Sequence, residues 1–187
     1  AATTLLLAAW LLSLGMPRGP SLAAAALFAV LPVHAEAVTG VVGRFELLVA
    51  LLVLASALLF RRATDGPRLA TLPYAGALLA FLAALLSKEN AVVLPGVVAL
   101  GELLRRDVAE PLRPRLSQKA LPFAGLLVPL AAFAAFRVVF VGSGLVGGRG
   151  AFFDLDNPLA PLPGPLRAAN ALVLLLRYVA QAFVPLG

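Results

Sequence analysis

The chain has 187 residues, of which 61% are hydrophobic, 13% are charged and none is cysteine. Soluble domains contain about 45–50% apolar residues, and a chain of this length cannot bury such an excess in one globular core. Disulfides and thiolate chemistry are excluded. The net charge of +6 does not indicate nucleic-acid binding, because most basic residues lie in short segments between apolar runs, as is typical of membrane topology.

Apolar runs follow one another along the whole chain. They are rich in Leu, Ala and Val and lack the alternation of membrane β-strands, so they predict membrane helices, although several are shorter than the ~20 residues of a full span. The runs cover residues 1–17, 19–33, 47–60, 69–87, 90–101, 120–136 and 168–176, the last continuing to 186. We therefore predict an all-α polytopic bundle of about seven membrane segments, forming a single transmembrane domain over residues 1–187.

The connections between the runs alternate in their content of Lys and Arg. The basic connections lie near 15–20, 61–68 and 105–119, and the others lie near 34–44, 88–90 and 142–165. Cytoplasmic loops carry the excess of Lys and Arg, so the first set should be cytoplasmic and the second external. Prolines mark the segment 107–117 as a loop, and Pro32, Pro95 and Pro129 predict helix kinks.

Outside the cytoplasmic loops, most ionisable residues fall at the external ends of several runs. Charged groups at membrane depth are costly and by default mark a functional cavity. The residues are His34, Glu36, Arg44, Glu46, Lys88, Glu89, Arg137, Arg149, Asp154, Asp156 and Arg177.

Arginine and lysine in this set are candidates for binding a phosphate. The forked N–H donors of Arg44 suit a phosphate, and Lys88 could contact an anionic lipid head group. Glu89 would be the partner of Lys88 in that role. Arg177 should lie deep in the membrane, where its charge needs an anionic partner or water. The alternatives are an Arg44–Glu46 pair, an ordinary interfacial turn at Lys88, and an intramembrane pair of Arg177 with an acid such as Glu46. Arg137 should lie near the external interface, where its side chain can reach water.

The remaining polar residues allow both functional and structural interpretations. His34 and Glu36 could orient an acceptor or hold a metal together with other ligands, although a lone His-x-Glu is a weak metal motif. The alternative is a polar helix end at the lipid head groups. The segment from Asp154 to Asp156 is favoured as a turn before Pro158 rather than as a metal site. No metal site is therefore predicted, and a divalent metal stays an open possibility.

Several short segments, in order along the chain, resemble motifs of one enzyme family. They read LPVHAEAV at 31–38, VGRFELL at 42–48, LLSKENA at 85–91, DNPLA at 156–160 and RY at 177–178. This pattern is similar to that of the transmembrane tetratricopeptide-repeat protein O-mannosyltransferases. Leu31, Ala35 and Val42 depart from the family pattern, which has His, Thr and Ser there.

The resemblance implies a GT-C-like membrane glycosyltransferase. Such an enzyme transfers a sugar, often mannose, from a polyprenyl- or dolichyl-phosphate donor to a hydroxyl of a protein or other acceptor on the non-cytoplasmic face. The implied partners are membrane lipid, the lipid-linked donor and the protein acceptor, with no nucleic acid. Arg44, Lys88, Arg137 and Arg177 would bind the donor phosphate, while His34, Glu36, Glu46, Glu89 and Asn157 would line the site.

The family's catalytic acid lies in a first external loop, which the resemblance places upstream of Ala1. Glu36 and Asp156 are weaker candidates for it within the chain. We therefore expect a fragment that is inactive alone, with the tetratricopeptide repeats following it. The composition is typical of a GC-rich bacterial genome, which suggests an inner-membrane protein with a periplasmic site.

Two other functions fit the same charges. A transporter or flippase of a lipid-linked or anionic solute would use them without a reaction, but inverted internal repeats are not visible. A structural membrane subunit would use them as ion pairs between helices.

Overall fold

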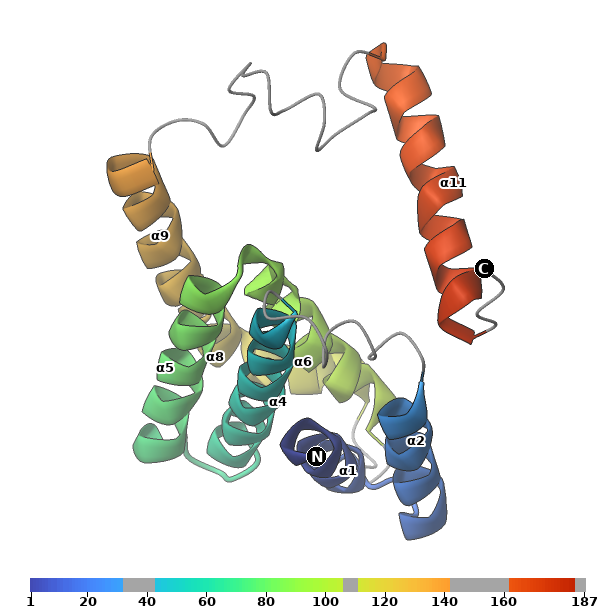
Figure 1. The fold of residues 1–187 in the computed structure, drawn as a ribbon. Coiled ribbons are helices and arrows are strands. Elements are labelled where there is room, and N and C mark those ends of the chain that lie inside the picture. The colour runs from blue at the N-terminus through green and yellow to red at the C-terminus, as the bar shows by residue number, and fades with distance from the viewer. Residues whose placement is uncertain (32–42, 106–110, 142–161, 184–187) are drawn as a thin grey trace. The chain divides into compact units, whose positions relative to one another are not determined.

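The computed structural model describes residues 1–31, 43–105, 111–141 and 162–183, and every regular element in these ranges is helical (Figure 1). This confirms the predicted all-α class. The chain divides into two compact units, one formed by Ala1–Val30 and His34–Ala134 and the other by Leu31–Val33 and Ala135–Gly187.

The first unit contains most of the helices. They are α1 (Ala2–Ser13), α2 (Arg18–Val30), α4 (Arg44–Thr64), α5 (Thr71–Ser87), the 3-10 turn η1 (Glu89–Val93), α6 (Leu94–Leu104), α7 (Leu112–Gln118), α8 (Ala120–Gly125) and nearly all of α9 (Leu127–Phe136). Leu and Ala dominate these helices, and both are strong helix formers. Each helix-length apolar run of the sequence in this unit therefore contains a helix.

Helix ends follow the local sequence. Gly15 adopts a φ of 77° just after α1, a left-handed conformation that glycine reaches without a steric penalty. Arg61 and Arg62 lie in the last turn of α4, where cations complement the helix dipole. Pro95 lies in the first turn of α6, where a missing N–H costs nothing, so it starts a helix rather than kinking one.

The segment predicted as a cytoplasmic loop contains a short helix instead. Pro111 caps α7 and Pro114 occupies its first turn. Proline is tolerated at both positions because these N–H groups would have no helical partner. The two prolines therefore mark the start of a helix here, and not a segment without structure.

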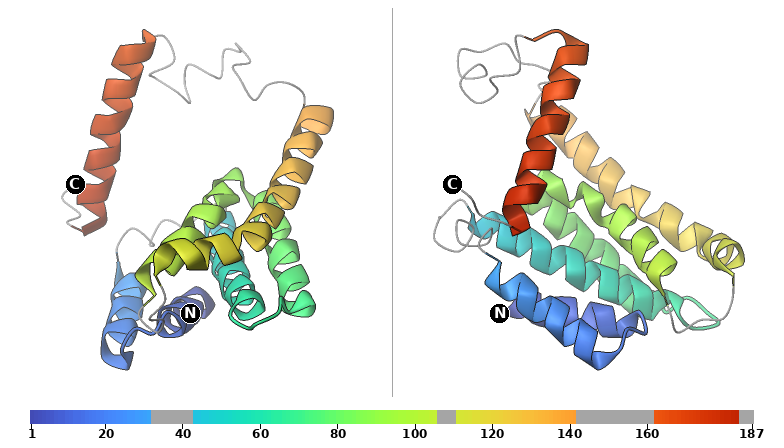
Figure 2. Two further views of the ribbon diagram at one scale, coloured as in Figure 1. Left: turned by 180° about the vertical axis from the view of Figure 1, so that it is seen from behind. Right: turned by 90° about the vertical axis from the view of Figure 1, so that its right-hand side faces the viewer.

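The packing of the first unit centres on α4, which lies between α1 and α5 (Figures 1 and 2). Phe60 of α4 and Phe81 of α5 are fully buried. The Phe60 ring also meets the Phe123 ring at a centroid distance of 5.2 Å in an edge-to-face arrangement, a favourable geometry for aromatic pairs. The Ser56 hydroxyl donates a buried hydrogen bond of 2.8 Å to the Ala77 carbonyl and so ties α4 to α5.

A break at Leu126 separates α8 from α9, three residues before Pro129. The Leu126 amide donates to the Phe123 carbonyl, three residues back, in place of regular α-helical bonding. The Tyr74 hydroxyl of α5 donates to the Pro122 carbonyl at 2.9 Å. Helix α9 continues through Pro129, so the interruption lies at Leu126 and not at the proline, and Pro32 lies outside the described residues.

Two helices of the described ranges are long and apolar enough to cross a membrane. They are Arg44–Thr64 and Ala120–Phe140, each of 21 residues, and α1, α2 and α5 are shorter apolar helices. Leu72, Leu79, Leu121 and Val128 are exposed on the surfaces of these helices. Lipid can cover such a surface without cost, whereas water cannot, which agrees with the membrane assignment made from composition.

The second unit contributes few described elements. They are the end of α9, the π-helical turn η2 (Arg137–Val141) and α11 (Gly164–Phe183). The Phe136 and Phe140 rings pack at a centroid distance of 5.0 Å.

Candidate functional site

An ion pair joins α4 to the end of α5 at the place where sequence analysis expected an external site. Glu46 lies in the first turn of α4, and Lys88 follows the last residue of α5. The Lys88 ammonium donates to Glu46 Oε1. The two side chains keep 34% and 42% of their surface exposed, so an incoming ligand could reach both.

The local backbone explains why Lys88 reaches this position. Lys88 has φ −163° and ψ 141°, an extended conformation that ends α5 and begins the connection to η1. The side chain can therefore leave the axis of α5 and meet the start of the neighbouring helix α4. Because α4 and α5 are antiparallel and packed together, residues 42 positions apart in sequence meet at one end of the pair.

The other described site candidates of the first unit, Arg44 and Glu89, are more exposed to solvent. Arg44 is the first residue of α4 and is exposed, and Glu89 opens η1 and is also exposed. Glu46 takes Lys88 as its partner, and not Arg44 as the sequence suggested. Lys88 likewise pairs with Glu46, where the sequence suggested Glu89.

Arg137 and Arg177 belong to the second unit, in η2 and α11 respectively. Arg177 is exposed on α11, and Arg137 is partly buried. Six candidates lie outside the described residues, namely His34, Glu36, Arg149, Asp154, Asp156 and Asn157. Within the described ranges, no three His, Asp or Glu side chains gather as a metal site would require.

A second charge cluster lies at the opposite end of α4, and we call it the Asp65–Glu102 network. Fifteen residues separate Glu46 from Arg61 along α4, which corresponds to about 22 Å at ~1.5 Å per residue. Lys119 Nζ lies 2.7 Å from Glu102 Oε1 and 3.4 Å from Asp65 Oδ1. The network consists of Arg61, Asp65, Glu102, Arg105 and Lys119.

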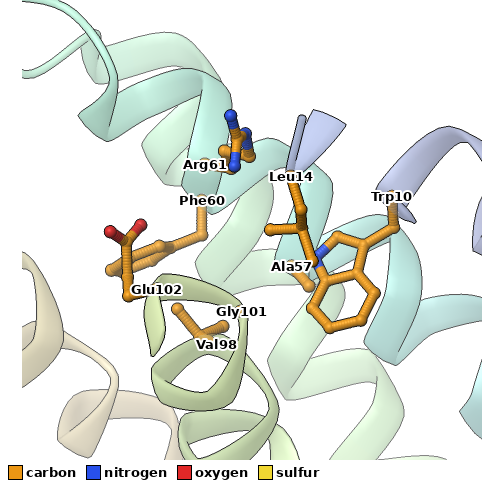
Figure 3. Close-up of a pocket in the computed structure, with 8 residues that line it drawn as sticks. All are labelled: Trp10, Leu14, Ala57, Phe60, Arg61, Val98, Gly101 and Glu102. Carbon is orange, nitrogen blue, oxygen red and sulfur yellow. The ribbon is translucent and has the colours of Figure 1, made fainter. Parts of the chain in front are cut away.

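The network was not predicted from the sequence, because its charges lie in or beside connections that the sequence indicates as cytoplasmic loops. Glu102 is only 4% exposed, and it lines a small pocket with Arg61, Phe60 and Trp10, with room for about one water molecule (Figure 3). One signal was present in the sequence. Glu102 is an acid at the end of the apolar run 90–101, with Leu103 and Leu104 after it, and an acid among apolar residues needs a cationic partner.

The two clusters differ in what they can do chemically. In the Asp65–Glu102 network, Arg61, Glu102 and Lys119 are buried, whereas the Asp65 side chain is 32% exposed. Its charges pair with one another, as expected for a structural element that fixes α4, α6 and the start of α8. The Glu46–Lys88 pair is half exposed, and an ammonium group has three N–H donors, so Lys88 can donate to a ligand while it still contacts Glu46. The Glu46–Lys88 end is therefore the better candidate for binding an anionic substrate.

Comparison with known proteins gives a consistent result. The human protein O-mannosyl-transferase TMTC3 is 35% identical over 164 residues, which are 79% of this chain and 18% of the relative. The Drosophila melanogaster protein O-mannosyl-transferase Tmtc2 is 34% identical over 146 residues, which are 76% of the chain and 15% of the relative. The chain is a relative of the TMTC protein O-mannosyl-transferases. The resemblance inferred from the motifs is thereby confirmed.

The TMTC resemblance covers most of the chain but a small part of each relative. Human TMTC4 is 34% identical over 162 residues, which are 76% of the chain and 22% of TMTC4. The chain thus spans about a fifth of the length of the TMTC proteins that it matches. No family profile and no solved structure matches the chain.

Proposed function

We propose that the protein takes part in protein O-mannosylation as a GT-C-type membrane enzyme, with a polyprenyl-phosphate mannose as donor and a protein hydroxyl as acceptor on the non-cytoplasmic face. The observation that carries the proposal is the 34–35% identity to proteins named O-mannosyl-transferases over about three quarters of the chain. The exposed apolar helices support a lipid-linked donor, because they leave a surface on which a polyprenyl chain can lie.

The Glu46–Lys88 end would hold the phosphate of this donor. Lys88, at the end of α5, supplies a compact positive charge, and Arg44, the first residue of α4, supplies an exposed guanidinium. Both groups suit a phosphate. Glu46 holds the Lys88 ammonium near the start of α4 before the donor arrives. Arg137 and Arg177 of the second unit are further proposed phosphate ligands, and His34, Glu36, Glu89 and Asn157 are proposed to line the site.

In the reaction, the bond between mannose C1 and the phosphate oxygen breaks, and the acceptor oxygen forms the new bond to C1. The phosphate keeps the electron pair of the broken bond, so its negative charge grows as the reaction proceeds. Cations at Lys88 and Arg44 would stabilise that charge more in the transition state than in the ground state. A carboxylate must take the acceptor proton, and Glu36 and Asp156 are the candidates that this chain offers.

The direct test is transfer by the purified full-length protein, including the upstream loop in which the family's catalytic acid is expected, in liposomes containing polyprenyl-phosphate [14C]mannose and with a Ser/Thr-rich peptide as acceptor. We expect label in the peptide with the lipid-linked donor and none when GDP-mannose replaces it. Label from GDP-mannose alone would contradict the proposed donor. Movement of the intact donor across the bilayer without any sugar transfer would indicate a flippase instead.

The role of Lys88 is tested by Lys88→Gln, with Arg62→Gln as the matched control. Each replacement removes one accessible cation: Lys88 is half exposed beside the start of α4, and Arg62 is exposed in the last turn of that helix. We expect Lys88→Gln to lower kcat/KM for the donor by about 10²-fold, the usual effect of removing one group that stabilises developing charge. An equal loss of kcat/KM in Lys88→Gln and Arg62→Gln would exclude a specific role for Lys88.

A further inference from the structure

The short helix α7 carries two arginines in different environments. It directly precedes the apolar helix Ala120–Phe140, so its basic residues lie next to a candidate membrane span. Arg113 is exposed, whereas Arg115 keeps only 8% of its surface accessible. Lys119 follows Arg115 by four residues, so the two share the buried side of this segment, and Lys119 is 9% exposed.

The two buried cations differ in their partners. Lys119 contacts both carboxylates of the Asp65–Glu102 network, at 2.7 and 3.4 Å. Arg115 makes no ion pair with the described residues, and its Nε and Nη1 are buried there without a hydrogen-bond partner. A guanidinium is charged at every physiological pH, and a buried, unpaired charge is among the most expensive arrangements in a protein. The position of Arg115 therefore calls for an anion.

The membrane context favours one kind of anion. Basic side chains next to a membrane span attract the head groups of anionic lipids, and basic pockets between membrane helices bind them specifically. The planar guanidinium also matches the geometry of a phosphate group. We propose that Arg115 binds the phosphate of an anionic membrane lipid at the end of the helices opposite the Glu46–Lys88 pair. Lys119 would neutralise Asp65 and Glu102, whose charge would otherwise repel the lipid.

This lipid site is distinct from the proposed donor site. Arg115 comes from α7 and lies beside the Asp65–Glu102 network, which starts about 22 Å along α4 from Glu46 at ~1.5 Å per residue. The site does not depend on mannosyl transfer, so it can be tested by lipid binding alone.

The test uses the full protein in nanodiscs of phosphatidylcholine, with or without phosphatidylglycerol. Native mass spectrometry counts the lipids retained after release, and thermal unfolding measures the stabilisation by phosphatidylglycerol. The matched control for Arg115→Gln is Arg113→Gln, which makes the same change of charge on the exposed side of the same helix. Inorganic phosphate added to pure phosphatidylcholine discs distinguishes a free ion from a lipid head group.

We expect the wild-type protein and Arg113→Gln to retain phosphatidylglycerol and to be stabilised by it. Arg115→Gln should weaken retention about fivefold or more, as expected for one lost cation at the lipid surface. Arg115→Lys keeps the charge but not the planar guanidinium, so it should lose an intermediate amount of phosphatidylglycerol retention. It replaces Arg115→Gln as the test variant if that protein does not fold.

Three results would overturn the proposal. The first is an equal loss of phosphatidylglycerol retention in Arg113→Gln and Arg115→Gln. The second is that the wild-type protein shows no preference for phosphatidylglycerol over phosphatidylcholine. The third is that inorganic phosphate stabilises the protein as much as phosphatidylglycerol does. The second result would mean that a carboxylate of the chain itself neutralises Arg115.

Discussion

Lysine–glutamate pairs occur near both ends of α4, and their burial gives them different roles. The Glu46–Lys88 pair is half exposed, and such pairs contribute only about 0–1 kcal/mol to stability. Glu102 and Lys119 keep only 4% and 9% of their surface accessible. The loss of one partner of a buried pair leaves an uncompensated charge away from water, which is strongly destabilising.

We predict that Lys119→Met lowers the free energy of unfolding by about 3 kcal/mol and that Lys88→Met lowers it by less than about 1 kcal/mol. Reversible unfolding of the protein in detergent micelles measures both. The double variant Glu102→Gln/Lys119→Met removes both charges and should recover part of the loss. A larger loss for Lys88→Met than for Lys119→Met would show that burial does not decide the roles of the two pairs.

At the scale of the elements, the contact of α5 with the α8–α9 break depends on one glycine. The Tyr74 side chain lies so close to Gly125 that a Cβ atom there would overlap the hydroxyl oxygen and lie 3.1 Å from Cζ. The same hydroxyl donates to the Pro122 carbonyl. A side chain at position 125 must therefore displace the ring and break this hydrogen bond.

Gly125→Ala should destabilise the protein by about 1–3 kcal/mol, the usual cost of overpacking, measured as a loss of thermal stability in detergent. Gly96 of α6 has open space around it, so Gly96→Ala is the control and should be neutral or slightly stabilising. In a Tyr74→Phe background, which lacks the overlapping oxygen, Gly125→Ala should cost less. An equal cost in both backgrounds would show that the tyrosine hydroxyl is not the obstacle.

Helix positions were predictable from the sequence, because apolar runs of Leu, Ala and Val favour helices wherever they lie. Helix α7 is not predictable from the sequence in the same way, because prolines indicate a loop as readily as the first turn of a helix, which tolerates them. Glu46 and Lys88 were each predicted as site residues, but their pairing was not. That contact depends on the rotation of α4 against α5, which short apolar runs do not specify.

At the scale of the whole molecule, two charged clusters with different proposed roles lie at opposite ends of α4. The half-exposed Glu46–Lys88 end is proposed to face the non-cytoplasmic side and hold the donor. The Asp65–Glu102 network is proposed to face the cytoplasm, where the positive-inside rule places the basic connections. Both clusters belong to the first unit, so a single folded body carries them.

The most direct test of this arrangement is labelling of single cysteines by a membrane-impermeant maleimide in sealed vesicles of known orientation. The chain has no cysteine, and Gly66 and Asn90 are both exposed, one in the turn after α4 and one in η1. We predict that Gly66→Cys is labelled only from the cytoplasmic side and Asn90→Cys only from the other side. Labelling of both variants from the same side, or with the two sides exchanged, would contradict the account.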